Sequence, residues 1–323
     1  VWWIPNRTCG LYTRTGENGL VNSSLISVRD VRKHFGEVHA VDGVDLDIGK
    51  GEIFGLIGHN GAGKSTMFKM LLGLLPATSG EIRIDGTTVH GAAFRAVRRQ
   101  IGYLPENVVF YDNLSGLETL YFFADLKGAP RSQAQPLLEK VGLAHAAQRR
   151  VKGYSKGMRQ RLGFAQALLG APALLFLDEP TNGLDPEGIR EFYGILREMK
   201  AQGVTVVLTS HILSEIQERV DRLAIMKLGK VQALGTLQSL REQNDLPLQV
   251  DVRLGSDGVE RLRSALAQLA VENLQVHDDH VFLQCRRHDK MAVLEALTAL
   301  DGKVLDLHVR EPSLEDVFLG YAG

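Results

Sequence analysis

Most of the chain alternates short apolar strands with amphipathic helical stretches. Segments 26–36 and 39–48 place apolar residues at alternate positions, as strands with one buried face do. Segment 80–89 has the same alternation, interrupted by Asp85 and Gly86, a pair that favours a tight hairpin turn. The pattern therefore predicts an antiparallel β flap near the start of the chain.

Two later stretches are mainly apolar and end in polar residues. They read PALLFLDEP (172–180) and VTVVLTSH (204–211), and such runs are typical of strands buried on both faces of a parallel sheet. Between them, after Asp185, apolar residues recur with helical spacing. Strands alternating with helices predict a parallel α/β core.

The pattern between residues 110 and 170 predicts helices and no strands. Breaks at Gly128, Pro130, Gly142 and Gly153 divide it into three or four segments. We place this helical insertion at about 108–168. It interrupts the α/β pattern and predicts a helical subdomain beside the sheet.

A second unit is expected after the polar stretch around residues 241–247. Beyond it the pattern gives the order β-α-β-β-α-β, which predicts a small ferredoxin-like α+β domain over 248–323. The first unit then covers 25–240. Residues 1–24 have neither helical nor strand periodicity, and we expect a disordered extension there.

A glycine-rich run, GHNGAGKST, separates the strand EIFGLIG from a helical stretch beginning KSTMFKMLL. Strand, glycine loop and helix start, in this order, form a P-loop, in which backbone N–H groups and the helix dipole hold phosphates. A turn that only caps a helix is the alternative. In a P-loop Lys64 reaches the β- and γ-phosphates, Ser65 binds Mg²⁺ and Thr66 lies near the α-phosphate. The predicted phosphate-binding residues are Gly58, His59, Asn60, Gly61, Ala62, Gly63, Lys64, Ser65 and Thr66.

Three polar residues stand at the ends of the two buried strands. Asp178 is predicted to hold Mg²⁺, and Glu179 to polarise an attacking water. His211 follows the other strand, at the carboxyl edge where open α/β sheets bind ligands, and could steady that water or the γ-phosphate. The alternatives are a helix-capping acidic pair and a solvated histidine. With the P-loop upstream, the three residues predict a catalytic site.

Composition adds constraints. Lys and Arg number 37 against 38 Asp and Glu, so no global basic field argues for nucleic acid. The two cysteines, Cys9 and Cys285, are far apart, which argues against a disulfide framework and for a reducing compartment. No apolar run approaches the roughly 18 residues of a membrane span. We therefore expect a cytoplasmic protein without direct membrane insertion.

Four motifs in order resemble the ATP-binding cassette of ABC transporters: GHNGAGKST, YSKGMRQRL, LLFLDEPTNGLD and TSH. The resemblance covers residues 26 to about 240. It implies a P-loop ABC fold, with ATP and Mg²⁺ as cofactors, ATP hydrolysis coupled to transport, and a peripheral place on the inner face of the plasma membrane beside an integral permease.

The resemblance also assigns individual residues. Phe35 falls where an aromatic ring stacks on adenine. YSKGM stands where the family signature LSGGQ lies, and it keeps Ser155 and Gly157, which would contact ATP held by a second copy in a head-to-tail homodimer. Asp185 matches the loop by which paired cassettes sense one another. Glu106 replaces the usual Gln, and we expect it to bind the metal and sense the γ-phosphate.

The resemblance leaves the cargo open. GYLPENVVFYDNLSGLETL together with AAQRRVKGYSKGMRQRLGFAQALLG most resembles the ATPase of the Nos-type transporter. This resemblance implies copper or sulfur cargo linked to nitrous oxide reductase maturation. Exporters of drugs or lipids are the alternative, and PSLEDVFL (312–319) is shared with exporter ATPases. Rival functions are a soluble translation or DNA-repair clamp and a regulatory module with negligible turnover.

Two features have open interpretations. Val109, Phe110 and Tyr111 either form a groove for a permease helix or pack inside the insertion. The tail carries potential copper or zinc ligands, for which scattered surface histidines are the alternative. These ligands are His277, His280, Cys285, His288 and His308.

Overall fold

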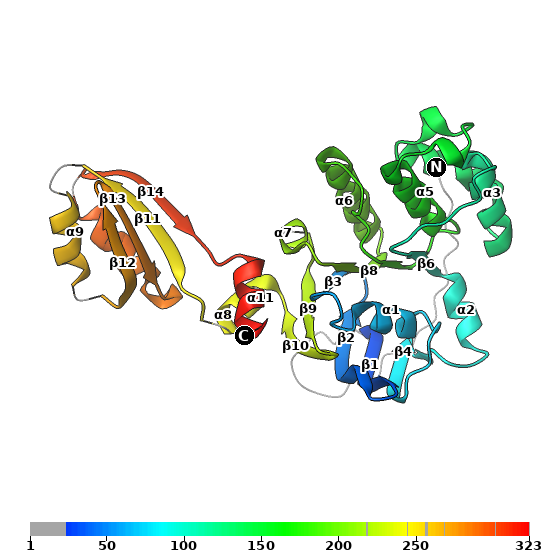
Figure 1. Ribbon diagram of the computed structural model, residues 1–323, viewed down its shortest axis with the longest axis horizontal. Helices are drawn as coiled ribbons and strands as arrows, with labels where there is room; N and C mark the ends of the chain where they lie inside the picture. The colour runs from blue at the N-terminus through cyan, green and yellow to red at the C-terminus, as the bar shows by residue number, and fades with distance from the viewer. Residues whose placement is uncertain are drawn as a thin grey trace, which may run out of the picture.

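The computed structural model describes residues 24–322, with gaps at 218, 244, 256, 257, 268 and 301 (Figure 1). The expected disordered extension, residues 1–24, lies outside the described residues except for Ser24, which begins the first strand. None of the helices in these described ranges combines the length and apolar character that crossing a bilayer requires.

The predicted antiparallel flap is confirmed. Its strand order is β2-β1-β4-β5, and all its pairs are antiparallel. Asp85 and Gly86 form the β4–β5 turn, both with positive φ (47° and 74°), as the hairpin signal predicts. The strands are β1 (Ser24–Phe35), β2 (Val38–Gly49), β4 (Ser79–Ile84) and β5 (Thr87–Thr88).

A six-stranded sheet forms the predicted α/β core. Its order is β10-β9-β3-β8-β7-β6, parallel except for the edge strand β10. Every residue of β3, β7 and β8 is buried, which explains their largely apolar character. The strands are β3 (Ile53–Ile57), β6 (Ile101–Leu104), β7 (Leu174–Leu177), β8 (Thr205–Ser210), β9 (Arg222–Lys227) and β10 (Lys230–Gly235).

Helices cover both faces of this sheet. One hydrophobic cluster joins α1 and the flap to one face, with Phe68 of α1 edge-on to Phe176 at 5.5 Å. Another cluster joins the helical insertion and α6 to the other face. The helices are α1 (Lys64–Leu71), α2 (Phe94–Arg99), α3 (Gly116–Lys127), α4 (Ala134–Lys140), α5 (Lys156–Leu168), α6 (Pro186–Ala201) and the single turn α7 (Leu213–Ile216).

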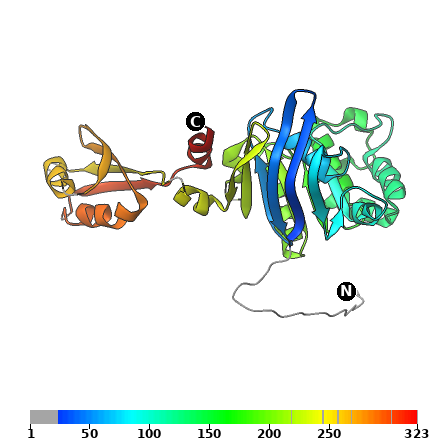
Figure 2. The same cartoon turned by 90° about the horizontal axis from the view of Figure 1, so that it is seen from below.

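The C-terminal sandwich has the predicted β-α-β-β-α-β order and strand order β12-β13-β11-β14. It lies at the opposite end of the molecule from the helical insertion (Figure 2). Its two helices cover one sheet face and share one core with it. The elements are β11 (Leu248–Leu254), α9 (Gly258–Leu266), β12 (Val271–His277), β13 (His280–Cys285), α10 (Lys290–Thr298) and β14 (Val304–Arg310).

The last helix leaves this sandwich. α11 (Leu314–Ala322) lies beside α8 (Leu237–Gln243), between the sandwich and the first unit (Figure 1). Its residues Leu314, Val317 and Phe318 are buried in the core of the first unit. The expected unit 248–323 is therefore divided, because its final helix packs with the α/β core.

Candidate functional site

The P-loop joins β3 to α1 in close contact with neighbouring strands. Gly63 has φ of 103°, and a Cβ built there would lie 2.4 Å from the carbonyl oxygen of Ala40 on β2. A residue with a side chain at this position would push the loop away from the sheet. The glycine therefore holds the loop in contact with β2 and in the bend that α1 requires.

Lys64, the first residue of α1, is 7% exposed. Its Nζ donates to the carbonyl oxygens of Gly58 and, at 3.2 Å, His59. Burial lowers the pKa of this ammonium, while the carboxylates of Glu179 and Asp178 act in the opposite direction. A cation held among backbone carbonyls at a helix start is suited to bind an anionic ligand.

A cleft of about 570 Å³ opens beside this loop. Phe35, at the end of β1, is 51% exposed and lines the cleft. Glu106, after β6, and Glu179 and His211, after β7 and β8, line it from the other strands. The P-loop residues on the lining are His59, Asn60, Gly61, Ala62, Gly63, Lys64, Ser65 and Thr66. The fold thus brings most of the predicted cofactor and catalytic residues to one place.

The backbone turns at Glu179, immediately after β7. Its φ of 47° is unusual for a residue with a side chain. This turn interrupts the strand alternation that would send neighbouring carboxylates to opposite faces. Glu179 Oε2 lies 2.7 Å from Nδ1 of His211 and accepts the His211 backbone N–H at 3.3 Å. The carboxylate and imidazole are thereby held together over the cleft.

Thr209 connects the two acidic residues. Its hydroxyl donates to Oδ1 of Asp178 at 2.6 Å and accepts the backbone N–H of Glu179 at 2.9 Å. All three residues are buried. Thr209 was not predicted from the sequence as part of this site, although it lies two residues before His211 on a buried strand.

Asp178 fits a magnesium site. Burial raises the pKa of its carboxyl above the ordinary aspartate value, partly offset by the Thr209 hydrogen bond. A nearby cation would stabilise such a buried carboxylate. The predicted ligands Asp178, Glu106 and Ser65 supply only oxygen atoms, which Mg²⁺ prefers.

Ser155, Gly157 and Asp185 lie elsewhere. They line a different hollow, which shares no lining residue with the P-loop cleft. Ser155 caps α5, where its Oγ accepts the Met158 backbone N–H at 3.2 Å. A Cβ at Gly157 would lie 2.7 Å from the carbonyl oxygen of Gly183, so this helix start packs tightly on the loop before α6.

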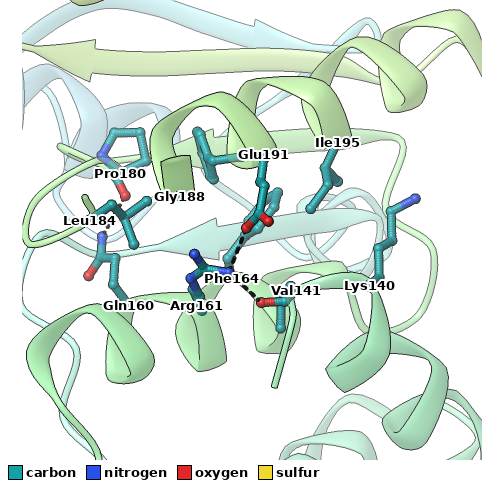
Figure 3. Close-up of a pocket in the computed structure, with 11 residues that line it drawn as sticks. Lys140, Val141, Gln160, Arg161, Phe164, Pro180, Leu184, Gly188, Glu191 and Ile195 are labelled. Carbon is teal, nitrogen blue, oxygen red and sulfur yellow. Dashed lines mark hydrogen bonds and ion pairs between the residues drawn. The ribbon is translucent and has the colours of Figure 1, made fainter. Parts of the chain in front are cut away.

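Arg161 joins this second surface to α6. It extends from α5 and donates to Glu191 of α6 at 2.7 Å and to the Val141 carbonyl at 3.3 Å (Figure 3). Gln160 donates to the carbonyl oxygen of Pro180, the residue after Glu179, at 3.0 Å. The cavity among these side chains encloses about 20 Å³, space for about one water. These contacts connect α5 to α6 and to the chain that follows β7.

One contact reaches the P-loop from the C-terminal helix. The ring of Phe318 on α11 is edge-on to His59, with 4.6 Å between ring centroids. The backbone N–H of Leu314 also donates to Gln217, after α7, at 2.9 Å. This contact between PSLEDVFL and the P-loop was not predicted from the sequence.

The tail histidines and Cys285 do not form a metal cluster within the described residues. Cys285 is buried in the sandwich core, where burial raises the pKa of its thiol. His277 and His280 face each other across the β12–β13 turn. The alternative, scattered histidines, describes these residues better.

Comparison with known proteins identifies the cassette. Residues 41–182 match the ABC transporter family. The bacitracin transport ATP-binding protein BcrA of Bacillus licheniformis is 36% identical over 304 residues, which cover 93% of this chain and 98% of that protein. The chain belongs to the ABC transporter ATP-binding proteins. The predicted ABC fold and ATPase class are thereby confirmed.

Two further relatives extend the comparison. The daunorubicin resistance ATP-binding protein DrrA3 of Streptomyces coeruleorubidus is 36% identical over 308 residues, 93% of this chain and 96% of that protein. A dimeric ABC cassette solved in a post-hydrolysis state with ADP and Pi is 27% identical, with a TM-score of 0.61. That alignment covers 66% of this chain and 98% of the solved cassette.

Proposed function

We propose that this ABC ATPase hydrolyses ATP at sites shared by two copies of the chain, and that it energises a separate membrane permease. The observation that carries the proposal is the separation of the P-loop cleft from the surface of Ser155 and Gly157. The solved cassette with ADP and Pi is dimeric, which supports pairing of such surfaces. A head-to-tail homodimer would place Ser155 of each copy on ATP held by the other.

The P-loop cleft would bind ATP in one orientation. Lys64 and the loop N–H groups would hold the phosphates, while Phe35 would stack on adenine. Asp178, Glu106 and Ser65 would hold Mg²⁺, which when bound neutralises charge on the β- and γ-phosphates. The nucleotide would thus extend from Phe35 to the strand ends.

Glu179 is our proposed base for hydrolysis. Its carboxylate would accept a proton from water as the water oxygen bonds to the γ-phosphorus and the bond to the ADP oxygen breaks. His211, 2.7 Å from Glu179, would orient this carboxylate and the γ-phosphate. Thr209 would keep Glu179 in its turned backbone conformation through the Glu179 N–H.

An exposed aromatic patch on the helical insertion is our proposed permease surface. Val109 is 84% exposed and Tyr111 61%, and Tyr111 is edge-on to Phe122 of α3 at 5.7 Å. Phe110 instead packs inward against Phe123 at 6.0 Å. The stretch therefore has one half-buried anchor and two exposed side chains, which suits a docking surface for an apolar permease helix.

We infer export of a drug-like or antibiotic compound as the transport function. BcrA and DrrA3 support this inference, since their names refer to bacitracin transport and daunorubicin resistance. A Nos-type copper role rests only on the resemblance of the two sequence stretches given above and finds no support in these relatives. Placement on the inner face of the plasma membrane follows from the permease partner.

Copurification tests the transporter function. The tagged chain would be extracted from membranes of its native cell in detergent and compared with the variant V109D/Y111D. We expect an integral membrane protein to copurify with the unmodified chain and to be lost from the variant, while ATP binding remains. Recovery of ribosomes or DNA in place of a membrane protein would contradict the proposal.

A further inference from the structure

Two histidines and an aspartate gather on the β1–β2 hairpin of the flap. His34 and His39 are direct partners in the strand pairing, and their ring centroids are 4.0 Å apart. Asp42 follows on β2. In the part of the chain that the structure describes, this is the one group of three His, Cys, Asp or Glu side chains whose ligand atoms all lie within 4.8 Å of one another.

One imidazole nitrogen in this group has no hydrogen-bond partner. It is Nε2 of His34, which is buried from solvent. A buried polar atom without a hydrogen-bond partner is destabilising, so each such atom in a folded protein calls for an explanation. A metal ion would supply the missing interaction, because an imidazole nitrogen with a free lone pair is a strong metal ligand.

We propose that His34, His39 and Asp42 form a binding site for Zn²⁺. Two imidazoles and one carboxylate match the ligand class that zinc takes in three-residue sites, with water as the fourth ligand. Tetrahedral zinc places its ligand atoms about 3.3 Å apart, given bonds of about 2.0–2.1 Å. His39 is exposed, so its side chain can turn to close the remaining gap.

Asp42 already contacts two cations, and zinc would replace one of them. Its Oδ2 lies 3.2 Å from Nζ of Lys230, a side chain that is 58% exposed and free to leave. Its Oδ1 lies 3.1 Å from Arg32, which also contacts Asp30 at 2.8 Å. Zinc at Oδ2 would displace Lys230 and leave Arg32 in place. This competition makes the site weaker than a structural zinc site and reversible.

The position of the site connects it to the nucleotide. Phe35, the proposed adenine platform, follows His34 directly, and His39 lines the P-loop cleft. Zinc would bridge β1 and β2 at the base of the turn that carries Phe35. It would thereby hold the half-exposed Phe35 on a stiffer hairpin than the β1–β2 pairing alone provides.

Calorimetric titration of the full chain with ZnCl₂, in buffer without nucleotide, tests the site. We expect one zinc per chain and a rise in Tm on saturation. In H39Q, which changes an exposed side chain, the affinity should fall at least about tenfold. The matched control is H288Q, which removes a 73% exposed histidine of the C-terminal domain and should bind as the unmodified chain does.

Two further measurements complete the test. Co²⁺ in place of Zn²⁺ should give the intense visible absorption of tetrahedral cobalt in the unmodified chain and lose it in H34Q. Excess Mg²⁺ should not displace zinc, because imidazole ligands do not suit this hard cation. The proposal is overturned if zinc does not bind, if H39Q and the control bind equally, or if the cobalt spectrum is octahedral.

Discussion

The P-loop cleft and the Ser155 surface differ in how they are built. The cleft is lined by the buried ammonium of Lys64 and by the buried carboxylate of Glu179, a residue with positive φ, and Asp178 is buried next to Glu179. Ser155 instead is an exposed helix cap, beside an Asp185 side chain that is 70% exposed. Folding of one chain thus assembles the charged half of the proposed ATP site, the P-loop cleft. The other half, the Ser155 surface, stays exposed.

This difference indicates where the free energy for closing the site comes from. Buried charges need partners, and in the cleft hydrogen bonds and ion pairs within the chain satisfy them. Ser155 and the adjacent backbone need no such support, since water can satisfy them until a ligand arrives. ATP held by a second copy would therefore supply the interaction that brings the two halves together.

Replacing Glu179 by Gln should have the largest effect on the charged half. The amide cannot accept a proton, so we expect hydrolysis to fall by about 10²–10⁴-fold. ATP affinity should change little, because Lys64 and the loop remain. Release of phosphate and binding of a fluorescent ATP analogue measure the two effects separately. Hydrolysis at the unmodified rate would refute the role of Glu179.

Replacing Lys64 by Ala should weaken ATP binding, whereas replacing Glu179 by Gln should slow ATP hydrolysis. Loss of a buried charge contact to the phosphates costs about 2–5 kcal/mol, which weakens ATP binding by roughly 30-fold or more. Calorimetric titration with MgATP measures this change. Lys69, in the last turn of α1, gives a matched control, since K69A should keep normal affinity. Equal affinities would contradict the phosphate assignment.

Replacing Ser155 by Ala should affect only the Ser155 surface, the half of the proposed ATP site without buried charges. We expect nearly normal ATP affinity in the single chain and hydrolysis reduced about tenfold, because one hydrogen bond to a charged phosphate is lost. The change also removes a helix cap, which costs about 1 kcal/mol. Ser115 caps α3 in the same way, so S115A controls for that loss of stability. A similar fall of hydrolysis in both variants would assign the effect to stability.

Replacing Phe318 by Ala should have the smallest effect on ATP. It removes the ring that packs on His59, and we expect the KM for ATP to rise a few-fold with little change in kcat. The lost burial should lower stability by about 3–5 kcal/mol, so Tm should also fall. Phe282, 41% exposed on the sandwich sheet, is the control. An unchanged KM for ATP in F318A would show that α11 does not influence ATP binding at the P-loop.

The sequence predicted the elements that local patterns specify. The buried strands β7 and β8 and the Asp85-Gly86 turn were predicted correctly because burial and turn geometry restrict residue type. Lys64 followed from the P-loop motif, and Glu179 and His211 followed from their places at strand ends. Periodicity predicts such elements well because it reports burial directly.

The remaining features depend on contacts between distant segments. The docking of α11 on the first unit and the bridge through Thr209 join residues far apart in the chain, which periodicity cannot show. The metal ligands were sought in the tail, although the described group is His34, His39 and Asp42. Pairing of His34 with His39 depends on the β1–β2 register, which has several irregularities.

Sedimentation velocity of the Glu179→Gln variant tests the shared site most directly. The account predicts a monomer without nucleotide and a dimer with MgATP, since hydrolysis no longer reopens the pair. Adding S155A to the same chain should return it to the monomer while ATP stays bound. A variant that stays monomeric with saturating ATP, or a dimer unaffected by S155A, would contradict a site completed by a second copy.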